Sequence, residues 1–207
     1  MLNSLDDIQR QQRSTPTAPP PLQFVNVACG LDARAFRLSW PLHTRVYEID
    51  RPEVLRHKAG RLDTVAAKPS CAARYVVEAD VVTDPWEERL LGQGFDPSLP
   101  SVWLAEDLLP YLPEPEVSRL LRRMRAISAP GSFVGADHPA TRLANSRFAE
   151  RLMDKLRHMK APLVSSTDDP EGLLRSCGWD SPDVTFLGEK RAHYGPFLRY
   201  LRLSLWL

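Results

Sequence analysis

Residues 24–50 read FVNVACGLDARAFRLSWPLHTRVYEID and place two apolar runs on either side of a glycine. The first run, Phe24–Cys29, is rich in apolar and β-branched residues, which predicts a buried strand. Gly30 ends the run, and a second strand is expected over Arg45–Ile49 with Asp50 directly after it. Open α/β sheets that bind nucleosides use this order of strand, glycine turn, helix, strand and acid. The glycine lets the ligand approach the backbone, and the carboxylate binds the ribose hydroxyls.

The glycine turn indicates which nucleoside to expect. A dinucleotide site needs three glycines so that the pyrophosphate can reach the helix N-terminus, and the turn ACGLDAR at residues 28–34 has one. Asp32 also lies where an anionic pyrophosphate would have to approach. A ligand without phosphates, with a cationic sulfur and an amino-acid end, suits this acidic turn better. That ligand is S-adenosylmethionine.

Four runs extend the pattern along the chain. They are GLDARAFRL at 30–38, RVYEIDRPEVLRHK at 45–58, EADVVTDPW at 78–86 and GFDPSLPSVWLAEDLLPYLPEPEV at 94–117. In this order they resemble the leucine carboxyl methyltransferase family, and more closely its bacterial and secondary-metabolite branch of S-adenosylmethionine-dependent O-methyltransferases. The chain departs from that family in two ways. Ala28 replaces the first glycine of the usual Gly-x-Gly turn, and little of the family's long helical N-terminal region precedes the first strand.

The resemblance implies an α/β fold, the Rossmann-like class I methyltransferase fold. Its sheet has seven mostly parallel strands with a C-terminal antiparallel hairpin, and helices cover both faces. The chain's own ending favours the hairpin, because two strands are expected at 184–188 and 200–207 and leucines alternate along the second. The remaining strands are expected at 74–79, 101–105 and 132–136. Helices are expected at 33–38, 53–62, 86–91, 114–128, 141–159 and 171–177.

The same resemblance assigns roles at the cofactor. Asp50 would bind the ribose, and the turn at Ala28 and Gly30 would admit the ligand to the backbone. Asp80 would accept from the adenine amino group while the Val81 amide donates to a ring nitrogen. Read from its residues alone, Asp80 could equally be the N-cap of the helix expected at 86–91.

Glu106 matches a family glutamate that would hold the methionine amino group, an interaction of about 1.5–3 kcal/mol. Arg34 either meets the methionine carboxylate or pairs on the surface with Asp32 or Glu48. Arg51 either follows the adenine edge or is a solvated arginine.

Two further residues are candidates on the acceptor side. Tyr111 matches a family tyrosine and either borders the acceptor or packs in the core with its hydroxyl satisfied. His138 follows the fifth expected strand and is a candidate general base. A base matters for a hydroxyl acceptor, since a carboxylate is already ionised at neutral pH. The other reading of His138 is an ordinary loop residue.

Composition limits the other possibilities. The 207 residues suit one domain over 23–207, after a flexible proline-rich segment at 1–22. A formal charge of +1 gives no electrostatic reason to expect nucleic acid or membrane as a partner. The three cysteines show no C-x-x-C spacing, which predicts reduced thiols and a cytoplasmic protein. The histidines show no metal-ligand spacing, so no metal is expected.

The function expected from the sequence is therefore methyl transfer from S-adenosylmethionine to a carboxylate or hydroxyl of a small molecule or peptide. The short N-terminal region suggests a truncated or diverged member of the family, an open pocket, or a partner or oligomer that covers the cofactor site. The alternative is a catalytically inactive methyltransferase-like domain that serves as a binding or scaffolding module.

Overall fold

The computed structural model describes residues 22–144, 150–185 and 205–206. The chain divides into two compact units. Unit 1 comprises Met1–Trp103 and Ser128–Phe133, and unit 2 comprises Leu104–Ile127 and Val134–Leu207. The expected flexible segment at 1–22 lies almost wholly outside the described residues.

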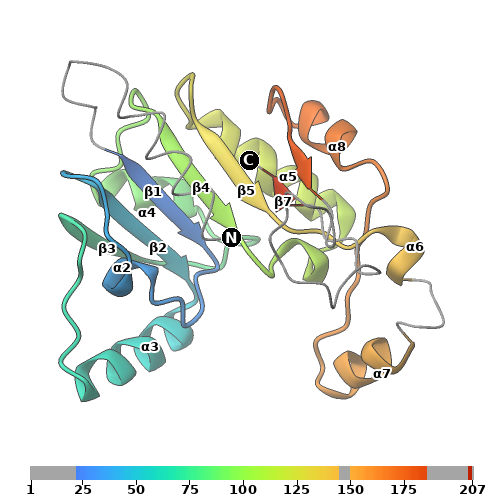
Figure 1. Ribbon diagram of the computed structural model, residues 1–207, viewed down its shortest axis with the longest axis horizontal. Coiled ribbons are helices and arrows are strands. Elements are labelled where there is room, and N and C mark those ends of the chain that lie inside the picture. Colours follow the sequence, from blue (N-terminus) through green and yellow to red (C-terminus); the bar gives the residue numbers. More distant parts are fainter. Residues whose placement is uncertain (1–21, 145–149, 186–204, 207) are drawn as a thin grey trace. The chain divides into compact units, whose positions relative to one another are not determined.

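Five strands form one sheet in the order β3-β2-β1-β4-β5 (Figure 1). Their bounds are Gln23–Val27 for β1, Arg45–Asp50 for β2, Ala73–Glu78 for β3, Ser101–Ala105 for β4 and Phe133–Ala136 for β5. The order reverses between β1 and β4, as in doubly wound α/β sheets. Strands β1, β2 and β3 pair in parallel, with Val27 opposite Ile49 and Ile49 opposite Val77. The carboxyl ends of these three strands therefore meet at one edge of the sheet. The residues predicted to bind the adenosine part of the cofactor follow these strand ends.

The helices begin and end close to where the sequence predicts them. Their bounds are Arg34–Arg37 for α2, Pro52–Thr64 for α3, Trp86–Gly92 for α4, Glu114–Ala126 for α5, Thr141–Ala144 for α6, Glu150–His158 for α7 and Pro170–Ser176 for α8. A 3₁₀ helix, η1, spans Leu109–Tyr111. Proline occupies the first turn of α3, α5 and α8, where its missing N–H costs no helical hydrogen bond. Within the range of the single helix expected at 141–159 the structure shows α6 and α7, and residues 145–149 between them lie outside the described residues.

Unit 1 is centred on aromatic side chains. Trp86 of α4 and Trp103 of β4 are fully buried, with ring centroids 6.0 Å apart. Phe95 lies 5.5 Å from Trp103 and 5.7 Å from Tyr47 of β2, so these rings join α4 to the sheet. The indole N–H of Trp103 is satisfied by the hydroxyls of Ser101 and Ser128.

Unit 2 packs around the apolar face of α5. Val117, Leu120, Leu121 and Met124 are buried there, as the helical spacing predicts. Trp179 donates its indole N–H to the Leu121 carbonyl at 3.1 Å, and Arg125 lies over the Trp179 ring at 5.8 Å.

The C-terminal strands differ from the prediction in the described residues. β6, Val184–Thr185, and β7, Leu205–Trp206, pair antiparallel in a sheet of their own, so the described residues form five strands plus two. The remainder of the expected hairpin lies outside the described residues, and the seven-stranded sheet stays a prediction.

Three further observations concern the thiols, the helices and the possible metal ligands of the described residues. Cys29, Cys71 and Cys177 are free thiols. In the described part of the chain, no helix has the length and apolarity needed to cross a bilayer. No cluster of three or more His, Cys, Asp and Glu in that part could hold a metal ion.

Candidate cofactor site

The turn after β1 has two residues in the left-handed backbone region. Gly30 has φ of 50° and Ala28 has φ of 54°. Glycine adopts this conformation freely, whereas an L-residue with a Cβ pays about 1–2 kcal/mol there. The backbone of Ala28 thus takes the conformation suited to a glycine, at the position where the resembled family has one.

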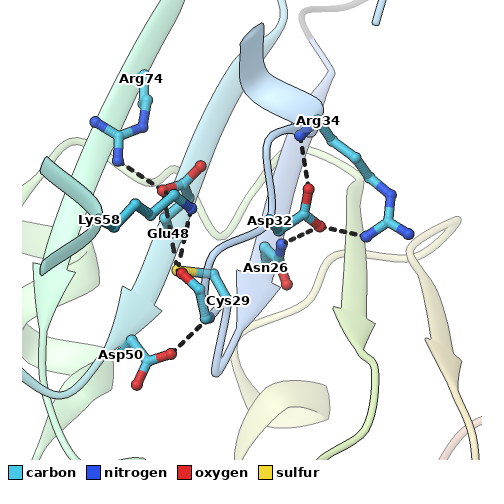
Figure 2. A network of polar contacts seen from close by, with 9 residues as sticks. Asn26, Cys29, Asp32, Arg34, Glu48, Asp50, Lys58 and Arg74 are labelled. Atoms are coloured by element: carbon cyan, nitrogen blue, oxygen red, sulfur yellow. Dashed lines mark hydrogen bonds and ion pairs between the residues drawn. The ribbon is translucent and has the colours of Figure 1, made fainter. Parts of the chain in front are cut away.

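Asp50 is fixed against this turn (Figure 2). Its Oδ2 accepts the Gly30 N–H at 2.7 Å, and its Oδ1 accepts the Arg51 N–H at 2.8 Å. A carboxylate has about four acceptor sites. Each Asp50 oxygen accepts one backbone N–H and therefore keeps one free lone pair, which can accept a hydrogen bond from a ribose hydroxyl. Asp50 is 8% exposed, and these two backbone N–H groups set the orientation of its carboxylate. This geometry is suited to binding a ribose diol beside a glycine turn.

Glu48, two residues before Asp50, has a different role. Its Oε2 lies 2.6 Å from Lys58 Nζ of α3 and 2.7 Å from an Arg74 nitrogen of β3, in a buried cluster. The Cys29 thiol adjoins this cluster, with Sγ 3.6 Å from Lys58 Nζ. Burial, followed by the charge of Glu48, raises the pKa of Cys29 to about 12, so the thiol stays protonated and unreactive. Nothing in the sequence pattern singled out this cluster, because its three charges come from three separate elements.

Asp32 and Arg34 bind each other. The Arg34 guanidinium pairs with Asp32 Oδ2, which also accepts from Asn26 Nδ2 at 2.9 Å. Of the two alternatives for Arg34, the structure shows the pair with Asp32. This pairing also offsets the charge of Asp32. The charge of Asp32 is therefore a weaker reason to exclude a pyrophosphate than the sequence indicates, and the single glycine is the stronger reason.

The other predicted residues of unit 1 are Asp80 and Val81, which follow β3, and Arg51, which follows β2. Asp80 follows β3, and its Oδ1 caps a turn by accepting from Val82 N at 2.9 Å. The N-cap of α4 is Pro85, so the alternative that Asp80 caps this helix is wrong. Val81 is buried beside Asp80. The Arg51 side chain is 58% exposed, with Nε 3.5 Å from Glu53, which matches its reading as a solvated arginine.

Unit 1 therefore brings Ala28, Gly30 and Asp50 together at the turn, and Asp80 lies near them. The Ala79 N–H, just before Asp80, donates to the Asp50 carbonyl at 2.9 Å, which keeps the ends of β2 and β3 side by side.

Unit 2 holds a second group of acids after β4 and β5. Glu106 and Asp107 directly follow β4, and Asp137 directly follows β5. Asp137 Oδ1 accepts the Asp107 N–H at 2.6 Å. Burial, and beyond it the charges of Asp107 and Glu106, raise the pKa of Asp137 to about 6. Tyr111 of η1 is 38% exposed, which is inconsistent with core packing. Its pKa is raised by partial burial and by the charges of Asp107 and Asp137.

His138 is turned into unit 2. It is 2% exposed, and its Nε2 lies 3.1 Å from the Ser165 hydroxyl. That hydroxyl donates to the Leu109 carbonyl at 2.9 Å. Burial lowers the pKa of His138, so the ring is neutral at pH 7. His138 also lines a cavity of about 300 Å³ with residues of α5 and α8, among them Glu114, Ser118 and Leu173.

Sequence reasoning missed Asp137. The sequence contained a signal for it, because Asp137 is the first residue after β5. Asp80, which was singled out, is in the same way the second residue after β3. The neighbouring imidazole was singled out instead, because histidine is the commoner general base.

Comparison with known proteins identifies the family. The sequence profile described as leucine carboxyl methyltransferase matches residues 16–125, which is more than half of the chain. The chain belongs to the leucine carboxyl methyltransferase family. The matched range contains the glycine turn, Asp50, Asp80, Glu106 and Tyr111. It ends before Asp137 and His138.

Curated relatives are similar over part of their length. A Mycobacterium bovis protein named "putative S-adenosyl-L-methionine-dependent methyltransferase" is 50% identical over 115 residues, covering 56% of this chain and 36% of the relative. A Mycolicibacterium vanbaalenii protein of the same name is 37% identical over 175 residues, covering 79% of this chain and 55% of the relative. This member of the leucine carboxyl methyltransferase family thus spans about half, or less, of the curated relatives' length.

Solved structures show the fold. Human N-acetylserotonin methyltransferase, solved in complex with S-adenosylmethionine, superposes with a TM-score of 0.59 at 15% sequence identity. The superposition covers 99% of this chain and 55% of the human chain. The family member described here therefore has the Rossmann-like fold of S-adenosylmethionine-dependent methyltransferases.

Proposed function

We propose that the chain is an S-adenosylmethionine-dependent O-methyltransferase that acts on a carboxylate or hydroxyl of a small molecule or peptide. The observation that carries the proposal is the Asp50 carboxylate held 2.7 Å from the Gly30 N–H at the end of β2. Family membership and the names of the curated relatives support the same activity.

Each residue has a defined task in this proposal. Bound S-adenosylmethionine supplies an electrophilic methyl group on a sulfonium. Asp50 accepts from the ribose hydroxyls, and Asp80 accepts from the adenine amino group beside the Val81 amide. Glu106 accepts from the methionine ammonium. Catalysis then rests on holding the acceptor oxygen in near-attack geometry, without a covalent enzyme intermediate.

The protonation state of His138 bears on whether the methyl acceptor is a hydroxyl or a carboxylate. A hydroxyl must lose its proton during transfer, whereas a carboxylate is already ionised at neutral pH. Burial lowers the pKa of His138, which keeps the ring in the neutral form that a general base requires. A hydroxyl acceptor would use this base, and a carboxylate acceptor would not. The variant His138→Gln therefore separates the two, since it should slow methylation of a phenol and spare methylation of a carboxylic acid.

Isothermal titration with S-adenosylmethionine and S-adenosylhomocysteine tests the proposal. We expect both to bind the wild-type protein and the control Glu53→Gln, which changes an exposed acid near the turn. Asp50→Asn should lose both ligands, because it removes the charge and one acceptor oxygen. Failure of the wild-type protein to bind either ligand would refute the proposal. Binding without label transfer to any phenol, alcohol, acid or peptide would instead indicate an inactive binding module.

A partner or second copy over the cofactor site remains a further part of the proposal. Light scattering of the chain, alone and saturated with S-adenosylhomocysteine, measures whether it self-associates. An unchanged monomer mass in both states would exclude the second copy.

A further inference from the structure

The ends of β4 and β5 each carry an aspartate in an uncommon environment. Asp107 has φ of 51°, in the left-handed region, which is uncommon for L-residues although aspartate enters it more readily than most. Asp137 is a carboxyl group that is 5% exposed. Residues held in such unfavourable states persist where the surrounding structure imposes them, and they concentrate at functional sites.

One hydrogen bond connects the two features. Asp137 Oδ1 accepts the Asp107 N–H at 2.6 Å. Asp137 directly follows β5, and Asp107 is the second residue after β4. The bond therefore ties the ends of two strands and holds the backbone of Asp107 in its left-handed conformation. Glu106 lies between the end of β4 and this tie, so both sides of its backbone are fixed.

We infer that Asp137 is a positioning residue that holds the turn after β4 so that Glu106 meets the ammonium of the cofactor's methionine end. This inference rests on the proposed function. Asp137 acts through the Asp107 amide and does not itself touch the ligand. Unit 1 has a similar arrangement, in which the carboxylate of Asp50 at the end of β2 accepts the backbone N–H of Gly30 in the turn after β1, at 2.7 Å.

The charges around Asp137 agree with this role. Glu106, Asp107 and Asp137 are three acids that follow the ends of β4 and β5. After partial burial and the charge of Asp107, the charge of Asp137 also raises the pKa of Tyr111. After burial, the negative charges of Asp107 and Glu106 act on the Asp137 carboxyl and raise its pKa. A cationic ligand end beside Glu106 would therefore lie among acidic side chains, which favours it electrostatically.

The experiment compares two ligands that differ at that end. S-adenosylhomocysteine carries the amino-acid end, and 5′-methylthioadenosine has the same nucleoside and thioether without it. Titrations use the full chain as wild type, Asp137→Ala and Asp137→Asn. Asparagine keeps an oxygen that can accept the Asp107 N–H, and alanine does not. Asp169→Ala is the matched control, because it removes an acid that caps α8 in the same unit.

We expect Asp137→Ala to raise the Kd for S-adenosylhomocysteine about tenfold or more, the loss that a misplaced charged hydrogen bond produces. The Kd for 5′-methylthioadenosine should stay within about twofold of the wild-type value. Asp137→Asn should retain most of the affinity for both ligands, and Asp169→Ala should change neither. If Asp137→Ala does not fold, Asp137→Ser replaces it, since the serine hydroxyl is too short to reach the Asp107 amide.

Equal losses for both ligands would overturn the inference, because a merely structural role weakens the whole site. Unchanged affinity for S-adenosylhomocysteine in the alanine or serine variant would overturn it as well, while leaving the proposed function standing. Wild-type protein that binds neither ligand would overturn both proposals.

Discussion

At the scale of single residues, Ala28 leads to a prediction about stability. Its φ of 54° is a conformation that glycine adopts without the Cβ penalty. Ala28→Gly should therefore raise the free energy of unfolding by about 1 kcal/mol, the strain relieved less the entropy that glycine loses. Urea denaturation measures the change.

The control for this substitution is Ala28→Val. A β-branched side chain tolerates the left-handed region less well than alanine, so valine should destabilise the fold. If Ala28→Gly instead lowered stability by the amount that glycine costs inside a regular strand, the assignment of strain to this turn would be wrong.

Asp137 leads to a prediction about pH. The unfolded carboxyl titrates near 3.8 and the folded one at about 6, so between these values the folded state holds a proton that the unfolded state has lost. Folding stability therefore falls as the pH rises from about 4 to about 6 and stays lower above that. Asp137→Asn removes this loss. It should be more stable than wild type above pH 6, by up to about 3 kcal/mol.

Urea unfolding of both proteins from pH 4.5 to pH 7.5 gives the comparison. The difference should shrink toward the acid end of the range. Glu53→Gln, at an exposed acid, should give a small difference that does not follow this curve. A difference between Asp137→Asn and wild type that is constant with pH would contradict the prediction.

At the scale of elements, the Glu48 cluster holds α3 and β3 to β2. Lys58 and Glu48 are each about 2% exposed and their charged atoms are 2.6 Å apart. Removing one partner of a buried pair leaves a charge uncompensated, which costs about 3–5 kcal/mol. Lys58→Met should lie at the low end of that range, about 3 kcal/mol, because Arg74 still faces Glu48.

A double-mutant cycle tests whether the pair acts as a unit. Adding Glu48→Gln to Lys58→Met should cost less than the two single losses combined, with a coupling of at least about 1 kcal/mol. The exposed pair Arg175–Glu171, 3.0 Å apart, is the control, and Arg175→Ala should change stability by less than about 0.5 kcal/mol. Additive losses at Glu48 and Lys58 would show that the buried contact is not a coupled pair.

The bounds of the strands and helices show how much of the fold the sequence could predict. β4 was predicted to its end residues, and β1, β2 and β3 to within two residues, because short apolar runs bounded by glycine, proline or an acid are strong local signals. The helix expected at 141–159 is observed as α6 and α7. Residues 145–149 between these two helices lie outside the described residues, so the continuity of the expected helix stays a prediction.

The sequence predicted the placement of residues whose position follows from the end of a strand. Gly30 and Asp50 lie together after β1 and β2, as expected, and their cofactor roles stay a prediction. Arg34 was left with two readings, since its choice between Asp32 and a ligand depends on side-chain geometry. The role of Asp137 depends on a hydrogen bond between the ends of two strands, which no local pattern encodes.

At the scale of the whole molecule, ligand binding should appear as stability. A ligand that binds the folded state alone, at about 100 times its Kd, adds about 2.7 kcal/mol to the free energy of unfolding. For a chain of this size that corresponds to a rise in Tm of about 5–10 °C. We expect S-adenosylhomocysteine to produce this rise in the wild-type protein and in Glu53→Gln. The same concentration of a nicotinamide dinucleotide should produce none, because the turn has a single glycine where a pyrophosphate site needs three.

Asp50→Asn completes this prediction, because its two expected effects are separable. Without ligand its Tm should fall, since the Gly30 N–H or the Arg51 N–H loses its acceptor and an unpaired buried donor costs about 1–3 kcal/mol. With S-adenosylhomocysteine its Tm should not rise. A variant with a lower Tm that still shows the full rise in Tm with S-adenosylhomocysteine would mean that Asp50 stabilises the turn but does not bind the ribose. The adenosine assignment would then fall, although the fold and the family would stand.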